Sequence, residues 1–97
     1  MISIQFKQLN GTPFQKLVWA ELLKIKRGET VTYKELAKRI GKPKAIRAVA
    51  NAVGANPLPV KIPCHRVVRS DGTIGGYSGR GGVKTKKMLL KQEGVIF

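Results

Sequence analysis

Residues 31–53 read VTYKELAKRIGKPKAIRAVANAV, and this stretch decides the fold. Thr32 and Glu35 have the spacing of a capping box, so a short helix is expected to run to about Ile40 and to stop at Gly41. Lys42-Pro43 then opens a further helix. Its apolar face is formed by Ile46, Val49, Ala50 and Val53. Two short helices joined by a tight glycine turn predict a helix-turn-helix.

The outward positions of the second of these helices carry small side chains and one projecting arginine. These positions are Lys44, Ala45, Arg47, Ala48, Asn51 and Ala52. Small side chains let a helix backbone approach another surface closely, while Arg47 reaches beyond them. This suits a narrow groove entered by a single plug better than a row of base contacts. An alanine-rich helix with one solvated arginine is the alternative.

Helices are also expected on either side of this pair. Thr12, Pro13 and Gln15 have the pattern of a helix start, and the apolar spacing continues until Gly28. The last helix is expected from about Val83 to Gln92, with Gly94 as its C-terminal cap. Residues 1–11 are expected to form a strand or tether, and residues 12–97 a single domain.

Between these helices, Val67-Val68 runs into the turn Ser70-Asp71-Gly72-Thr73, which predicts a small β-hairpin. The expected fold is therefore mostly α with a small β-hairpin, a winged-helix-like domain that contains the helix-turn-helix. Nineteen Lys and Arg against five acids give a formal net charge of +14. Such an excess favours a polyanionic partner, with nucleic acid first, over a merely charged soluble surface.

The sequence disfavours membrane, secreted, disulfide-bonded and zinc-binding proteins. No apolar run approaches the roughly 18 residues of a membrane span, and the N-terminus lacks the features of a secretory signal. One cysteine forms no internal disulfide and fits a reducing compartment, which predicts a cytoplasmic location, or a nuclear one in a eukaryote. One Cys and one His cannot supply the four ligands of a structural zinc site. We expect a monomer without metal or cofactor.

The only cysteine and the only histidine are adjacent, in Ile62-Pro63-Cys64-His65-Arg66-Val67-Val68. A lone cysteine is usually an inert small hydrophobe. Here a proline fixes the backbone before the thiol, and neighbouring His65 and Arg66 charge is expected to lower its pKa. Because adjacent residues of a strand face opposite ways, Cys64 and His65 need a local bend or a bridging water to cooperate.

Glu93 lies in an apolar frame in the last turn of a helix, where a carboxylate opposes the helix dipole. Such an acid suggests a specific partner, and His65 is the obvious one; a solvated terminal glutamate is the alternative. A Cys, a His and a carboxylate together make an activated thiol. In a basic protein with a helix-turn-helix, that thiol suggests chemistry on a base that has left the stack.

Two loops flank this group. Asn56-Pro57-Leu58-Pro59 cannot be helical, and Asn56 either cross-links this segment or is a plain turn residue. Residues 75–82 contain five glycines and lack a phosphate-binding motif. The Tyr77-Ser78 pair within them indicates a binding loop rather than a flexible linker.

The chain resembles the O6-alkylguanine-DNA alkyltransferases, also called methylated-DNA–protein-cysteine methyltransferases, from Thr12 to Gly94. The motifs that carry the resemblance are Pro63-Cys64-His65-Arg66-Val67-Val68, Asn56-Pro57, Gly76-Tyr77-Ser78-Gly79 and Glu93-Gly94. The resemblance implies repair of double-stranded DNA that contains O6-alkylguanine. The base would flip out, and its alkyl group would move irreversibly to Cys64, so that each molecule acts once.

The resemblance also implies roles for single residues. His65 would deprotonate Cys64 through a water, Glu93 would hold His65, and Asn56 would tie the helix-turn-helix to the active-site segment. The implied substrate contacts are Tyr33, Pro59, the main chain at Cys64 and Val67, Tyr77, Ser78 near O6, and Gly79. The implied DNA contacts are Arg47, which would fill the gap left by the flipped nucleotide in the minor groove, and Lys44, Ala45, Ala48 and Asn51.

Family members usually carry an additional N-terminal domain, and only a few residues precede Thr12 here, so the resemblance is to the catalytic C-terminal domain alone. The alkyltransferase-like proteins are about this length and bind alkylated DNA without repairing it. They replace the cysteine, whereas this chain keeps Cys64, which favours repair over sensing. A third hypothesis is a helix-turn-helix regulator with an incidental thiol.

Overall fold

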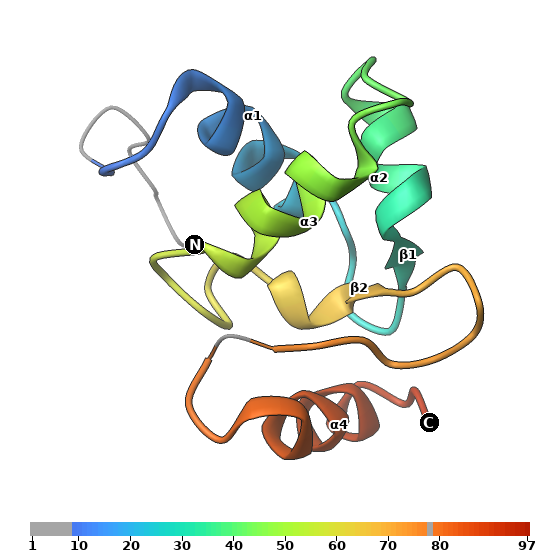
Figure 1. Ribbon diagram of the computed structural model, residues 1–97. Coiled ribbons are helices and arrows are strands. Elements are labelled where there is room, and N and C mark those ends of the chain that lie inside the picture. The colour runs from blue at the N-terminus through green and yellow to red at the C-terminus, as the bar shows by residue number, and fades with distance from the viewer. Residues whose placement is uncertain (1–8, 78) are drawn as a thin grey trace.

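The computed structural model describes residues 9–77 and 79–97. The expected strand or tether at residues 1–11 lies largely outside the described residues. In chain order the elements are α1 (Pro13–Leu22), β1 (Val31–Thr32), α2 (Tyr33–Arg39), α3 (Ile46–Gly54), the 3₁₀ turn η2 (Cys64–Arg66), β2 (Val67–Val68) and α4 (Gly82–Gln92), as Figure 1 shows.

Both predicted capping boxes are present. The Thr12 hydroxyl accepts from the Gln15 amide at 3.1 Å, and the Gln15 side chain accepts from the Thr12 amide at 2.9 Å. Thr32 and Glu35 make the same pair of bonds at the start of α2, both at 3.0 Å. Gly94 follows α4 with a φ of +86°, the left-handed conformation of a helix-ending glycine.

Two helix boundaries differ from the sequence prediction. Helix α1 ends at Leu22 rather than near Gly28, and the amide of Ile25 instead bonds the carbonyl of Leu22 in a tight turn. Helix α3 begins at Ile46, not at Pro43, because the Ala45 amide bonds the Lys42 carbonyl at 2.9 Å and closes a turn there. The link between α2 and α3 is therefore longer than a single glycine turn.

The mostly helical fold with a small sheet is confirmed, but the sheet is not a hairpin. Val31 and Thr32 pair in parallel with Val67 and Val68. The turn after β2 does form, since the Arg69 amide bonds the Thr73 carbonyl at 3.1 Å. Within the described residues this turn does not lead into a returning strand, so the partner of β2 comes from the segment before α2.

Helices α1, α2 and α3 enclose one apolar core. Its largest buried side chains include Trp19, Leu22 and Leu36. The indole of Trp19 donates to the carbonyl of Ala52 at 2.8 Å, so α1 packs on the face of α3 that carries Ala52. The prediction that Ala52 points outward is wrong; it is 2% exposed.

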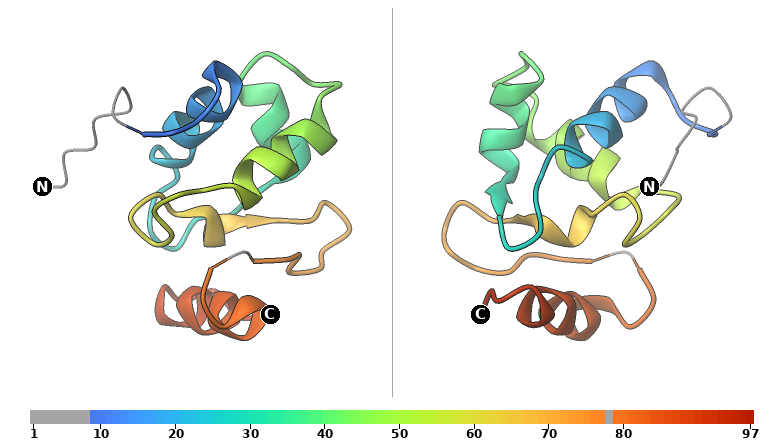
Figure 2. Two further views of the ribbon diagram at one scale, coloured as in Figure 1. Left: turned by 60° about the vertical axis from the view of Figure 1, so that its left-hand side comes forward. Right: turned by 180° about the vertical axis from the view of Figure 1, so that it is seen from behind.

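Helix α4 forms a separate layer. Figures 1 and 2 show it lying below η2 and β2, with the segment after β2 running between the two layers. The residues of η2 therefore stand between the helix-turn-helix and α4. Within residues 9–77 and 79–97, every helix falls short of the length and apolar character that a bilayer crossing requires.

Candidate active site

Cys64 stands at the start of η2, directly after the Ile62-Pro63 pair. Its amide donates to the carbonyl of Ile62 at 2.8 Å, and the amide of Arg66 donates to the carbonyl of Pro63 at 3.1 Å. These bonds coil the backbone, so Cys64 and His65 do not alternate across a strand. The bend that an adjacent Cys-His pair requires is present.

The thiol of Cys64 is buried, with 3% of the residue exposed. Burial raises its pKa, and the neighbouring Asn56 amide and Lys86 ammonium offset only part of this effect. The expectation that His65 and Arg66 lower the pKa is wrong, because burial outweighs the nearby charges and Arg66 is turned towards an acid. The thiol therefore keeps its proton at neutral pH, and a base must remove it when it reacts.

His65 and Arg66 converge on Glu93, which follows α4. Nε2 of His65 lies 2.8 Å from Oε2 of Glu93, the contact that the sequence suggested. Arg66 binds the same carboxylate at both oxygens, with Nε at 2.9 Å from Oε1 and Nη2 at 3.0 Å from Oε2. Its third nitrogen, Nη1, donates to the carbonyl of Ile25 at 2.7 Å. Arg66 thus fixes the carboxylate that orients His65.

These bonds also set the charge of Glu93. Burial alone would raise its pKa, but the hydrogen bonds from Arg66 and then His65 outweigh burial and lower the pKa of Glu93 to about 2. The carboxylate is therefore ionised throughout the physiological range. An ionised acid at Nε2 favours the histidine tautomer whose free lone pair is on Nδ1.

Glu93→Gln is expected to remove part of the acid sensitivity of the fold. The pKa of Glu93 is about 2 in the folded chain against an ordinary value of 4.5. Between these values the unfolded chain binds more protons, so the free energy of unfolding falls as the pH drops from above 4.5 towards 2, by roughly 3 kcal/mol at most. Urea unfolding at a series of pH values measures this loss.

The exposed Glu29 provides the matched control, because Glu29→Gln removes an acid of the same kind without touching His65 or Arg66. We expect the free energy of unfolding of Glu29→Gln to fall at acid pH as much as that of the wild type. An equal fall in Glu93→Gln and the wild type would contradict the assigned role of the Glu93 carboxylate.

Asn56 joins the end of the helix-turn-helix to the active-site segment. It is buried two residues beyond α3. Its Nδ2 donates to the carbonyl of Ile62 at 2.7 Å, and its Oδ1 accepts from the amide of Leu58 at 2.9 Å. The cross-linking alternative for Asn56 is therefore the observed one.

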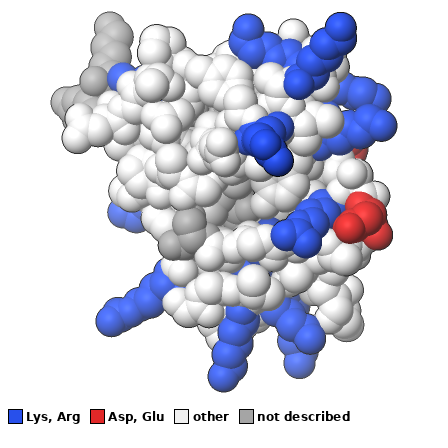
Figure 3. Space-filling model, viewed as in Figure 1, with Lys and Arg blue, Asp and Glu red and all other residues white. Residues whose placement is uncertain are grey.

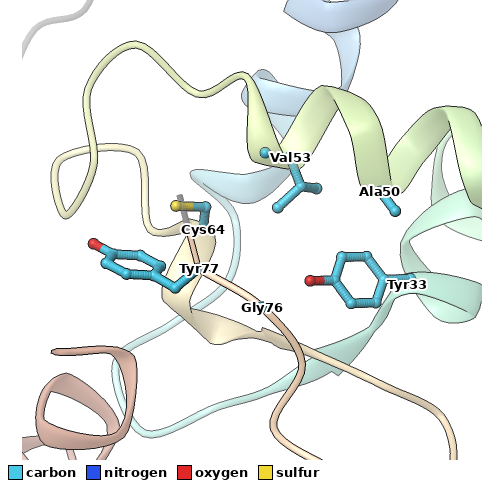
Figure 4. A pocket seen from close by; sticks show the side chains of 7 residues that line it. Tyr33, Ala50, Val53, Cys64, Gly76 and Tyr77 are labelled. Carbon is cyan, nitrogen blue, oxygen red and sulfur yellow. The ribbon is translucent and has the colours of Figure 1, made fainter. Parts of the chain in front are cut away.

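A pocket of about 310 Å³ opens beside Cys64. Its lining residues are Tyr33, Ala50, Val53, Gly54, Cys64, Gly76 and Tyr77. Figure 4 shows Ala50 and Val53 reaching into it from α3, with Tyr33 on one side and Tyr77 and Cys64 on the other. Burial, with the nearby Cys64, raises the pKa of both tyrosines, so their hydroxyls stay protonated and can donate hydrogen bonds.

Three residues that the resemblance implied as substrate contacts do not line this pocket. Pro59 is exposed. Val67 is buried, and its carbonyl accepts from Lys86 at 2.6 Å. A Cβ on Gly79 would lie 2.5 Å from the ring of Tyr77, so Gly79 shapes the pocket by leaving room for that ring. Ser78 lies outside the described residues.

A second hollow, of about 650 Å³, adjoins the pocket along α3. Its lining residues are Tyr33, Ile46, Arg47, Ala50, Asn51, Arg69 and Gly76, and three of them, Tyr33, Ala50 and Gly76, also line the pocket. Arg47 and Asn51 therefore stand at the pocket rim.

The other implied DNA contacts lie nearby on the same element or just before it. Ala48 is exposed on α3, whereas Lys44 and Ala45 precede the helix. On the face shown in Figure 3, Lys and Arg gather over α2, over the turn to α3 and along α4, and acidic atoms appear only at one edge. The face that carries the pocket is thus bordered by positive charge.

Three charged groups of the site were not assigned from the sequence. Arg66 was noted only as a charge beside the thiol, Arg69 was not singled out, and Lys86 stood within a lysine-rich helix. A signal did exist for Lys86, since it lies one helical turn before the buried Leu90. Within residues 9–77 and 79–97, no group of three His, Cys, Asp or Glu side chains is placed to hold a metal ion.

The family model described as "6-O-methylguanine DNA methyltransferase, DNA binding domain" matches residues 13–95. The chain belongs to this family. The description names a DNA-binding domain rather than a catalytic one. In the mouse, Mus musculus, a methylated-DNA–protein-cysteine methyltransferase is 54% identical to this family member over 81 residues, which are 84% of this chain and 38% of the mouse protein.

Solved structures of the family show the same fold. The Mycobacterium tuberculosis OGT in complex with DNA is 48% identical, with a TM-score of 0.83 over 89% of this chain and 52% of that one. The Schizosaccharomyces pombe (S. pombe) Atl1, in complex with damaged DNA containing O6-carboxymethylguanine, is 30% identical, with a TM-score of 0.75 over 89% of this chain and 80% of that one. The chain spans 23–38% of the length of the first curated relatives.

Proposed function

We propose that this protein repairs double-stranded DNA by direct reversal: it takes an O6-alkylguanine out of the duplex and transfers the alkyl group to Cys64, once per molecule. The observation that carries the proposal is the position of Cys64, the only cysteine, in the pocket wall and next to the paired His65 and Glu93. The family supports the substrate class. In this proposal the DNA-binding domain that the family model describes also carries out the transfer.

The first step is removal of the thiol proton. Because burial keeps Cys64 protonated, we assign His65 as the base, acting from Nδ1 through one water molecule. Nδ1 is buried and has no hydrogen-bond partner among the described residues, while Nε2 is occupied by Glu93. The imidazolium that forms is stabilised by the Glu93 carboxylate at 2.8 Å.

The second step transfers the alkyl group. The thiolate sulfur attacks the alkyl carbon, and a sulfur–carbon bond forms as the bond between that carbon and O6 breaks. The electron pair of the broken bond goes to the guanine, which takes up one proton, so the products are ordinary guanine and S-alkylated Cys64. A thioether is stable in water, so the protein is consumed by its own reaction.

The residues around Cys64 are proposed to contact the flipped base or the DNA. Tyr33 and Tyr77 line the pocket as hydrogen-bond donors to the base, and Gly79 leaves room for the Tyr77 ring. Pro59 and the main chain of Val67 do not line the pocket and are proposed as substrate contacts from the family resemblance alone. Ser78, which lies outside the described residues, is proposed near O6 on the same ground. Arg47 and Asn51 at the rim, with Ala48, Ala45 and Lys44, form the proposed DNA face.

The alternative is a sensor that binds the lesion without repairing it. The likeness to Atl1 favours this alternative at 30% identity, and the buried thiol beside a base favours transfer. The two are separated by incubating a limiting amount of protein with excess duplex carrying O6-methylguanine. We expect guanine to appear until one lesion per protein molecule is repaired, and then to stop. Tight binding without any guanine would show a sensor.

Arg47→Ala is expected to slow transfer from duplex DNA by roughly tenfold or more, because the flipped state, which costs a few kcal/mol, loses the side chain that fills the gap. Transfer from free O6-benzylguanine should stay within about twofold of wild type, since a free base needs no flipping. Rates of Cys64 alkylation with the two substrates measure the difference.

Arg47→Lys is the matched variant, because it keeps the charge and shortens the plug. With duplex DNA, we expect its rate of transfer to lie between that of the wild type and that of Arg47→Ala. Equal slowing of Arg47→Ala with duplex and with free base would refute the role of Arg47 in flipping.

A further inference from the structure

Among the Lys, Arg, Asp and Glu residues that the structure describes, only Lys86 is completely buried, with 0% of the residue exposed. Its Nζ donates to the carbonyl of Val67 at 2.6 Å and to the carbonyl of Gly76 at 3.0 Å. Among the described residues, its partners are these carbonyls and no carboxylate pairs with it. Burying a charge without an opposite charge is costly, so stability alone does not explain this lysine.

The two carbonyls belong to different segments, and of the two residues only Gly76 lines the pocket. Val67 begins β2, three residues after Cys64, whereas Gly76 lines the pocket and directly precedes Tyr77. Figures 1 and 2 show the segment after β2 running between α4 and the layer of η2 and β2. Lys86 reaches from α4 across this segment and joins it to β2.

The segment 74–77 has little else to hold it. Apart from the bond between Lys86 and Gly76, none of the hydrogen bonds found among the described residues involves residues 74–77. Gly75 is buried with a φ of +77°, and a Cβ there would lie 3.5 Å from both Nζ of Lys86 and Cε2 of Tyr33. The segment therefore passes between Lys86 and Tyr33 at Gly75.

We propose that Lys86 is a positioning residue of the alkyl-transfer pocket, which fixes the segment 74–77 against β2 and so holds Tyr77 beside Cys64. This inference rests on the proposed function for the reaction that it serves.

The charge of Lys86 also acts on the Cys64 thiol. Burial lowers the pKa of Lys86 to about 8, so the amine still carries a proton at neutral pH. That charge opposes the rise in the pKa of Cys64. Loss of Lys86 therefore acts on both the geometry of the pocket and the thiol.

The test compares Lys86→Met, which keeps the length but removes the donors and the charge, with Lys86→Gln, which keeps an N–H donor. Lys87→Met, at the exposed neighbour on α4, makes the same change in net charge and is the control. We expect Lys86→Met to transfer roughly ten- to hundredfold more slowly, both from duplex and from free O6-benzylguanine, because a displaced pocket wall affects every substrate. Lys86→Gln should recover part of the rate, and Lys87→Met should stay within about twofold of wild type.

Two readouts separate positioning from loss of the fold. Backbone ¹⁵N order parameters of residues 74–77 should fall in Lys86→Met while those of α1 to α3 are unchanged. The rate at which iodoacetamide alkylates Cys64, the only cysteine, should rise at higher pH than in the wild type, because the thiolate forms at higher pH. Because replacing a buried charge by an apolar side chain is often neutral or stabilising, the thermal midpoint should not fall with the rate.

Wild-type transfer rates in Lys86→Met, or slow transfer with unchanged order parameters in 74–77, would overturn the inference. If Lys86→Met does not fold, the same comparison is made with Lys86→Gln, which must show a slower rate and lower order parameters in 74–77, both in smaller measure. If the wild type itself transfers no alkyl group, the proposed function fails, whereas the order parameters still decide whether Lys86 holds the segment.

Discussion

A protein in which alanine replaces Cys64 is expected to bind duplex carrying O6-methylguanine with an affinity close to that of the wild type and to transfer no methyl group. The sulfur is the proposed acceptor, and the chain has no other cysteine. Removing a single buried atom leaves a small cavity at a cost of about 1 kcal/mol, so the pocket and α3 should stay in place. Repair is measured as guanine formed in the duplex, and binding by titration of labelled duplex.

Cys64→Ser is the matched variant, because it keeps a polar atom at the same position with far lower nucleophilicity. We expect it to bind and to leave the lesion intact. Transfer by Cys64→Ala would reveal a different acceptor. Loss of both binding and transfer, with the fold intact, would mean that Cys64 serves recognition rather than chemistry.

Asn56→Ala is expected to lower the free energy of unfolding by roughly 2–4 kcal/mol, because the Ile62 carbonyl and the Leu58 amide both lose a buried partner. Transfer should slow by more than about tenfold, since Cys64 follows Ile62-Pro63 directly and a small displacement of the nucleophile is costly. The Asn56 amide also opposes the rise in the pKa of Cys64, so its loss adds to this effect. Urea unfolding and single-turnover alkylation measure the two changes.

Asn51→Ala controls for the stability change, because Asn51 is exposed on α3 and makes no side-chain hydrogen bond among those of the described residues. Its free energy of unfolding should stay within about 0.5 kcal/mol of wild type. A stability in Asn56→Ala equal to that in Asn51→Ala would contradict the cross-linking role of Asn56.

Local chemistry explains which parts of the fold were predictable from the sequence. Thr12 with Gln15, and Thr32 with Glu35, satisfy amides three residues away, so their capping boxes depend on no distant contact. Gly94 likewise ends α4 through its own backbone freedom. The three helices that these signals mark are present.

Features that depend on distant partners were not predictable. Nothing local shows that Val67 pairs with Val31 instead of returning in a hairpin. Ala52 appeared to face outward because its partner, the Trp19 indole, lies 33 residues earlier. The Pro43 signal for a helix start was overridden by a turn closed through the carbonyl of Lys42.

In the candidate active site, too, some features were predictable from the sequence and others were not. The contact of His65 with Glu93 could be inferred because an acid among apolar residues needs a partner. The two bonds of Arg66 to that acid, and the burial of Lys86, depend on how α4 packs below η2. The pKa of Cys64 depends on how deeply the thiol is buried, which residue types alone do not reveal.

The most direct test of alkyl transfer to Cys64 is the intact mass of the protein after incubation with an excess of duplex containing O6-methylguanine, followed by mass mapping of its peptides. We predict that every active molecule gains one methyl group in place of one hydrogen, that the added mass maps to the peptide containing Cys64, and that further incubation adds nothing. An unchanged mass under excess substrate, or a methyl group on any other residue, would contradict the account.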